Sequence, residues 1–82
     1  MEKSLHKQAL EAYKSMVSIA AQNKAGQLDF ASSNQAEAFW LSYANTKKML
    51  DYVATGDQDS VRRLYKSAIE KTATYWKEKV AA

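Results

Sequence analysis

The chain contains no proline and only two glycines, Gly26 and Gly56, in 82 residues. Proline and glycine are the residues that most readily interrupt an α-helix, so long helices can be broken at few places in this sequence. Residues that favour helix, chiefly Ala, Lys, Glu, Gln, Leu and Met, dominate on either side of both glycines. The sequence therefore predicts an all-α protein whose helices end near its two glycines.

Apolar residues repeat with helical spacing in three segments, at about 4–24, 34–54 and 58–80. Ser4 is placed to cap the first segment, and Gly26 follows its last periodic residue as a helix stop. These signals predict the beginning and the end of the first helix.

Polar residues mark the ends of the other two segments. Asn34 and Glu37 have the spacing of a capping box, and Ser33 offers a second cap. Gly56 is expected to close the second helix as a left-handed residue, and Asp57 to cap the third. Because the turn between these two helices is short, they are expected to form an antiparallel hairpin.

We expect an antiparallel three-helix bundle that forms a single helical domain over residues 1–82 and self-associates. The connection at 24–33 leaves an alternative open, because Leu28 and Ala31 keep a helix-like spacing through it. A helix that continued through Gly26 would lose only about 1 kcal/mol. One long bent helix that forms a hairpin with a shorter one is the second possibility.

The apolar positions predict which side chains pack in the core. We expect three layers, formed by Tyr13, Met16 and Val17, by Phe39, Tyr43 and Leu50, and by Leu64, Ala68 and Tyr75. A chain of this length buries only roughly 60% of the surface that its unfolded form exposes. A second copy or a partner would therefore add stability.

The second helix carries apolar residues on two sides. Besides its core stripe it has a stripe on roughly the opposite side, formed by Ala38, Leu41, Met49 and Tyr52. No helix of a three-helix bundle can be buried on every side, so this second stripe is expected to be an interface with a partner. Scattered exposed apolar residues, which are common on protein surfaces, are the alternative interpretation.

The sequence contains no motif that is typical of an active site. The chain has no cysteine and one histidine, His6, which excludes a disulfide framework, thiolate metal sites and thiol catalysis. It also lacks a glycine-rich phosphate loop and a Gly-x-Ser-x-Gly motif. We therefore expect a protein that is not an enzyme and uses no cofactor or metal, with His6 in a partly buried structural position.

The net charge of +3 is small and spread along the chain, so nucleic acid is a less favoured partner. One basic edge, formed by Arg62, Arg63 and Lys66, offers a contact for an anionic ligand. Asp59 and Glu70 stand three or four residues from these cations, at the spacing of local ion pairs. A solvated, charge-balanced helix face is the simpler interpretation.

Residues 1–7 contain no apolar run long enough for the core of a signal peptide. No segment approaches the roughly 20 apolar residues that span a bilayer. Together with the missing cysteine, these features lead us to expect a cytoplasmic protein.

An Ala-rich amphipathic helix over residues 35–54 is followed by the Asp-bearing turn 55–59 and by a further amphipathic helix that includes 64–71 and Tyr75. This order of elements, within residues 8–79, resembles the phasins, small helical proteins that coat polyhydroxyalkanoate storage granules. The resemblance implies a protein without catalytic residues that self-associates and binds granules through helix faces.

Three functions are consistent with these patterns. The first is a non-enzymatic helical binding module that acts through self-association and through interaction with another protein. The second is a phasin-like amphipathic coat on a granule or lipid surface, which the wide apolar arc of the first helix suggests. The third is a small regulatory protein of the phage or plasmid type that binds nucleic acid or a host protein. We favour the first, because of the second apolar stripe.

Overall fold

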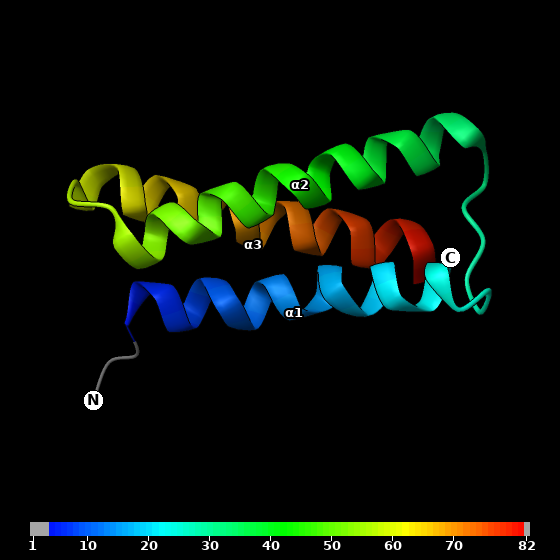
Figure 1. Ribbon diagram of the computed structural model, residues 1–82, viewed down its shortest axis with the longest axis horizontal. Helices are drawn as coiled ribbons and strands as arrows, with labels where there is room; N and C mark the ends of the chain where they lie inside the picture. Colours follow the sequence, from blue (N-terminus) through cyan, green and yellow to red (C-terminus); the bar gives the residue numbers. More distant parts are fainter. Residues whose placement is uncertain (1–3, 82) are drawn as a thin grey trace.

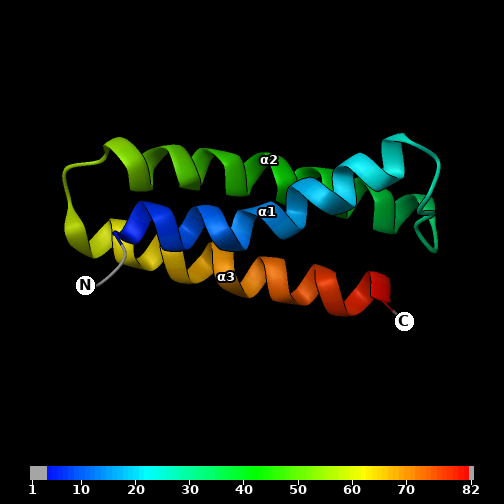
Figure 2. The ribbon, with the colours of Figure 1, turned by 90° about the horizontal axis from the view of Figure 1, so that it is seen from below.

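A computed structural model describes residues 4–81 of the chain. Over these residues it contains three α-helices, which are α1 (Leu5–Lys24), α2 (Ser33–Thr55) and α3 (Asp59–Ala81). Each helix packs against the other two, and α2 runs antiparallel to α1 and α3 (Figures 1 and 2). The all-α antiparallel three-helix bundle is therefore confirmed. Residues 1–3 and 82, which the predictions of a single domain and of a missing signal peptide include, lie outside the described residues.

Both ends of α1 are formed as the sequence predicts. The Ser4 hydroxyl accepts a hydrogen bond of 3.1 Å from an amide of the first turn. At the other end, the Gln27 amide donates to the Gln22 carbonyl and the Gly26 amide to the Asn23 carbonyl, which together make a Schellman motif. Gly26 has a φ of 74°, in the left-handed region that favours glycine. The helix ends here, so the alternative of one long bent helix is wrong.

The N-terminal cap of α2 is Ser32, not Ser33 or the predicted pair of Asn34 and Glu37. The Ser32 hydroxyl accepts from the Gln35 amide at 3.1 Å. The Gln35 side chain in turn accepts from the backbone amide just before Ser32, at 2.8 Å. Ser32 and Gln35 have capping-box spacing, so the signal was present in the sequence two residues before the pair we chose.

Gly56 closes α2 in an extended conformation, with φ −69° and ψ 157°, so the predicted left-handed conformation is wrong. An added Cβ there would lie 2.5 Å from Cε1 of Tyr52 and 2.6 Å from its carbonyl oxygen. Glycine is therefore needed because Tyr52 approaches closely, and not because of the backbone angles. The prediction that Asp57 caps α3 is also wrong, because α3 begins at Asp59 and its capping position is Gln58.

An aromatic cluster joins the three helices and the connection between α1 and α2. Phe39 is fully buried, and its ring centroid lies 5.1–5.9 Å from those of Phe30, Trp40, Tyr43 and Trp76. Tyr13 of α1 stacks on Tyr43 with centroids 5.6 Å apart. Burial, together with a hydrogen bond to Tyr43, raises the pKa of the Tyr13 hydroxyl above its ordinary value. Aromatic rings therefore join the three helices across the core, alongside its aliphatic residues.

The predicted core layers are confirmed in part. The buried apolar residues are Ala9, Tyr13, Met16, Ile19, Ala20, Phe39, Leu50, Val53, Ile69, Ala73 and Trp76. Three residues that we assigned to core layers are exposed instead: Val17 by 40%, Leu64 by 64% and Tyr75 by 51%. The apolar arc of α3 is wider than the stripe that its two neighbours cover, so one edge of the arc remains in water.

The two glycines should respond differently to alanine. Gly56→Ala is expected to destabilise the fold by about 1–3 kcal/mol, because the new methyl group collides with Tyr52. In a Tyr52→Ala background this cost should fall by at least about 0.5 kcal/mol, as expected for residues in contact. Unfolding in urea measures both values.

Gly26→Ala is the matched control. An added Cβ there meets no atom within 4 Å, so its cost of about 1–2 kcal/mol comes from the backbone alone and should not depend on Tyr52. If the cost of Gly56→Ala were the same in both backgrounds, the ring of Tyr52 would not be the reason for glycine, and only the Tyr52 carbonyl would remain as the cause.

Candidate interaction surface

The second apolar stripe of α2 is divided into an exposed and a covered part. Ala38 and Leu41 are exposed, Leu41 by 66%. Met49 is half-buried and packs against the core. The half-buried ring of Tyr52 meets the ring of Tyr65 on α3, with centroids 5.4 Å apart. Of the predicted interface, the structure therefore leaves mainly Ala38 and Leu41 open to a partner.

Two large apolar side chains of α3, Leu64 and Tyr75, are also exposed. Leu64 and Tyr75 are eleven residues apart, which is close to three helical turns, so they lie on the same side of α3. Tyr75 lines a groove of about 360 Å³ together with Ala38 of α2. We call the surface formed by Ala38, Leu41, Leu64 and Tyr75 the α2–α3 face.

The spacing along this side of α3 is typical of a helix that pairs with another helix. Ala68 and Lys71 stand between Leu64 and Tyr75, so that successive positions are four, three and four residues apart. Alternation of three and four is the repeat by which one helix presents a continuous seam to a second helix. The buried residues of α3 lie on its other side, so Leu64 and Tyr75 stay exposed, although Ala38 of α2 borders Tyr75.

Tyr75 stands among charged side chains that leave half of it exposed. The Lys79 ammonium lies 5.7 Å from the centroid of the Tyr75 ring, and the ring meets Trp76 edge-on at 5.2 Å. Lys71 and Glu78 line a shallow groove beside Tyr75 on α3. A tyrosine held by an aromatic neighbour and surrounded by charges has the character of an anchor residue in a protein interface.

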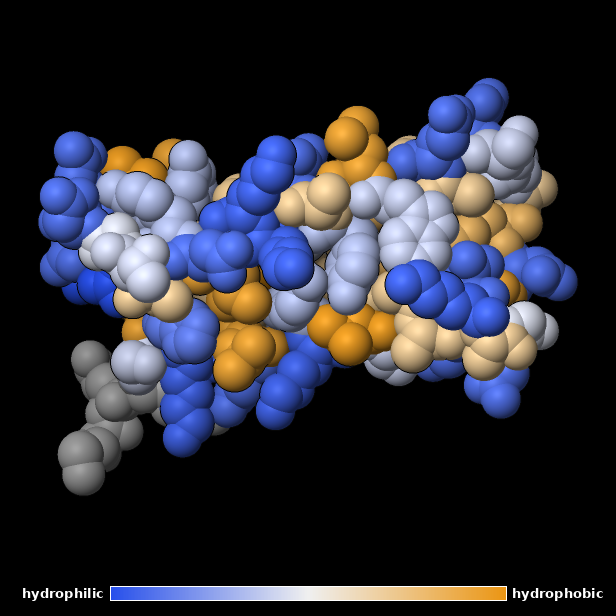
Figure 3. All heavy atoms as spheres, in the orientation of Figure 1, coloured by the Kyte–Doolittle hydropathy of each residue, from blue (hydrophilic) through white to orange (hydrophobic). Residues whose placement is uncertain are grey.

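The face made by α1 and α2 is different in character. Hydrophobic and hydrophilic side chains are interspersed over it (Figure 3). Trp40, which is half-buried, has the Lys24 ammonium 5.5 Å from its ring centroid. The lysine therefore covers an aromatic ring that would otherwise add to an apolar patch.

The predicted anionic contact at the start of α3 is largely occupied by contacts within the chain. Arg62 donates from Nε to the Val53 carbonyl at 2.9 Å and from its guanidinium to the Asp59 carboxylate at 3.0 Å. Lys66 pairs with Glu70 at 3.3 Å, and Arg63 is exposed. The local ion pairs are confirmed. Arg62 also satisfies a carbonyl in the last turn of α2, which the sequence did not indicate.

Other features of the described chain add no second type of site. Within residues 4–81, no group of three or more His, Asp and Glu side chains could hold a metal ion. His6 is half-buried in the first turn of α1. No helix in the described part of the chain is both long enough and apolar enough to cross a bilayer.

Comparisons with protein-family models, curated proteins and solved structures find no match for this chain, so the resemblance to phasins stays a prediction.

Arg62 and Arg63 allow a direct test of the structural role that we assign to Arg62. Arg62→Ala is expected to lower the free energy of unfolding by about 1–3 kcal/mol, because the Val53 carbonyl and Asp59 lose a charged donor. Arg63→Ala makes the same change at the next, exposed position and should alter it by no more than about 0.5 kcal/mol. Unfolding in urea measures both, and equal losses would contradict the structural role of Arg62.

Proposed function

We propose that this protein is a non-enzymatic helical binding module that acts through self-association and through binding another protein, with the α2–α3 face as its contact surface. One observation carries the proposal. Among the described residues, three of the four large apolar side chains that are exposed, Leu41, Leu64 and Tyr75, belong to this face. Exposed apolar side chains concentrated on one face are typical of an interaction site. Because the chain has no cysteine, we place this activity in the cytoplasm.

A second copy suits the α2–α3 face because the charges on α3 are self-complementary. Lys71 lies about one turn before Tyr75, and Glu78 lies about one turn after it. If two copies of α3 pack antiparallel about a point between Thr74 and Tyr75, the Lys71 of each copy faces the Glu78 of the other, whereas a crossing centred on Tyr75 itself would oppose Lys71 and Lys79. A symmetric dimer uses the same patch on both subunits, so opposite charges on either side of its centre favour pairing.

The size of the chain gives association an energetic role. A domain of this length buries only roughly 60% of its unfolded surface, so its own core provides limited stability. Pairing through the α2–α3 face would remove Leu41, Leu64 and Tyr75 from water, and each such side chain contributes about 1.5–3 kcal/mol when it is fully buried. Self-association would therefore bury apolar surface that the three-helix bundle leaves exposed to water.

The two other functions have less support. A phasin-like coat would depend on the apolar arc of α1, but much of that arc is core: Ala9, Tyr13, Met16, Ile19 and Ala20 are buried. Such a coat therefore requires the bundle to open. A reader of nucleic acid would use the basic edge of α3, where Arg62 and Lys66 already pair with carboxylates. To bind nucleic acid, the protein would have to break these two ion pairs and form contacts with phosphate groups instead.

Charge placed on the α2–α3 face should weaken self-association. Tyr75→Glu and Leu41→Glu are each expected to weaken it at least about tenfold, because a buried unpaired carboxylate disfavours a packed interface. Both positions are exposed, so helical content in circular dichroism should be unchanged. Size exclusion with light scattering, over a hundredfold dilution, measures the association.

Val17→Glu is the matched control, because it adds the same charge at an exposed apolar position of α1, outside the face. It should leave association as it is in the unmodified chain. An unmodified chain that is monomeric at every concentration, or a loss with Val17→Glu as large as with Tyr75→Glu, would contradict the proposal.

A further inference from the structure

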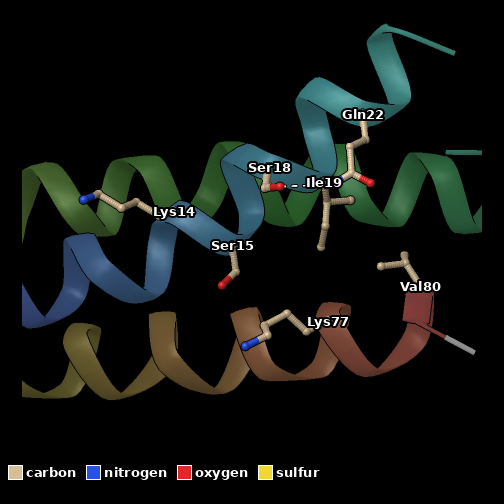
Figure 4. A pocket seen from close by; sticks show the side chains of 7 residues that line it. All are labelled: Lys14, Ser15, Ser18, Ile19, Gln22, Lys77 and Val80. Atoms are coloured by element: carbon tan, nitrogen blue, oxygen red, sulfur yellow. Dashed lines mark hydrogen bonds between the residues drawn. The ribbon is translucent and has the colours of Figure 1, made fainter. Parts of the chain in front are cut away.

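A groove of about 430 Å³ lies between α1 and α3, away from the α2–α3 face (Figure 4). Its apolar part is formed by Ile19 and Val80, whose side chains point into it from the two helices. Ile19 is buried and Val80 half-buried, and both pack with the core, so this part of the groove is a fixed surface. The groove is shallow and open to solvent, so a bound ligand would remain partly exposed.

The groove is cationic at one end and apolar at the other. The ammonium groups of Lys14 and Lys77 both extend toward the N-terminal side of the two helices, away from Val80 (Figure 4). The Ser15 side chain points into the space between the helices at this end. Neither lysine forms an ion pair with another residue of the described chain. This end therefore offers two positive charges and a hydroxyl group to a ligand, next to the carboxylates of the adjoining groove.

Carboxylates limit how far an anion can extend beyond the lysines. Glu11 and Glu70 line the continuation of the groove past Ser15 and Lys77. Glu70 is neutralised by Lys66 at 3.3 Å. A long polyanion would meet both acidic side chains, whereas a compact head group can stay beside Lys14 and Lys77. The charge pattern therefore selects a ligand with one small anionic group.

We propose that this groove binds a single-chain anionic amphiphile, of which a fatty-acid carboxylate is the simplest form. The alkyl chain lies on Ile19, Val80 and the aliphatic stem of Lys77, and the carboxylate lies between the ammonium groups of Lys14 and Lys77. Burial of the chain supplies affinity, and the two lysines fix its direction.

The dimensions of the groove favour one alkyl chain over a larger partner. The residues of α1 that line it lie between Lys14 and Gln22, about two turns of helix. Its apolar floor is two side chains wide, which is too little for the extended stripe that a docked helix needs. A membrane surface would need a broad exposed apolar area, and most of the apolar arc of α1 is already buried in the bundle.

Isothermal titration calorimetry with sodium laurate, below its critical micelle concentration, tests the proposal on the full chain. We expect one laurate per chain, and changes in amide chemical shift concentrated at residues 14–22 and 77–80. Lys77→Gln should weaken binding at least fivefold, because it removes one of the two cations. Lys47→Gln, an exposed lysine of α2 outside the groove, is the control and should change nothing. Dodecyl maltoside, an uncharged amphiphile whose alkyl group is one carbon longer than that of laurate, should bind at least fivefold more weakly than laurate.

Four results would overturn the proposal: no binding, several laurates per chain, equal losses for the two glutamine variants, or equal affinity for dodecyl maltoside. Binding to vesicles of anionic phospholipid without binding of monomeric laurate would also overturn it, and would assign the lysines to a membrane surface. The groove does not use the α2–α3 face, so Tyr75→Glu should leave laurate binding unchanged. Laurate binding therefore tests the groove alone, and self-association of the same variant tests the proposed function.

Discussion

The packing of Phe39 is the interaction on which the rest of the structure depends. Its buried ring on α2 contacts Phe30 from the connection and Trp76 of α3, and the neighbouring Tyr43 stacks on Tyr13 of α1. One aromatic cluster therefore holds all three helices in a chain that has no disulfide. The cluster also determines the surface. Because Trp76 points into the core, the residue before it, about 100° around the helix, has to face outward.

The parts of the fold that could be predicted from the sequence are those that depend on residues close to one another along the chain. Hydrophobic periodicity, the Ser4 cap and the left-handed Gly26 depend on residues close in sequence, and they place the helices within about a residue of their observed ends. The reason for glycine at position 56 could not be predicted, because it depends on where Tyr52 lies. Thr46 was missed because a hydroxyl suggests a surface position. Here it is buried and donates to carbonyls of its own helix.

The candidate surface was predicted only in part, because exposure depends on how neighbouring helices align. The second stripe of α2 was visible in the sequence, but the alignment of the hairpin decides that Tyr65 covers Tyr52 while Leu41 stays open. On α3 the width of the apolar arc was the available signal, since an arc wider than one stripe has to leave an edge uncovered. Which edge that is, with Leu64 and Tyr75 on it, follows from the positions of α1 and α2.

We propose that two copies of the chain meet through the α2–α3 face, with α3 in the middle of the interface. The most direct measurement is an isotope-filtered nuclear Overhauser experiment on a one-to-one mixture of labelled and unlabelled chains, which detects only contacts between copies. The account predicts contacts from the Tyr75 ring of one copy to Tyr75 and Leu41 of the other. Contacts between copies that involve Val17 and α1 instead, or no contacts at a concentration where the chain is dimeric, would contradict it.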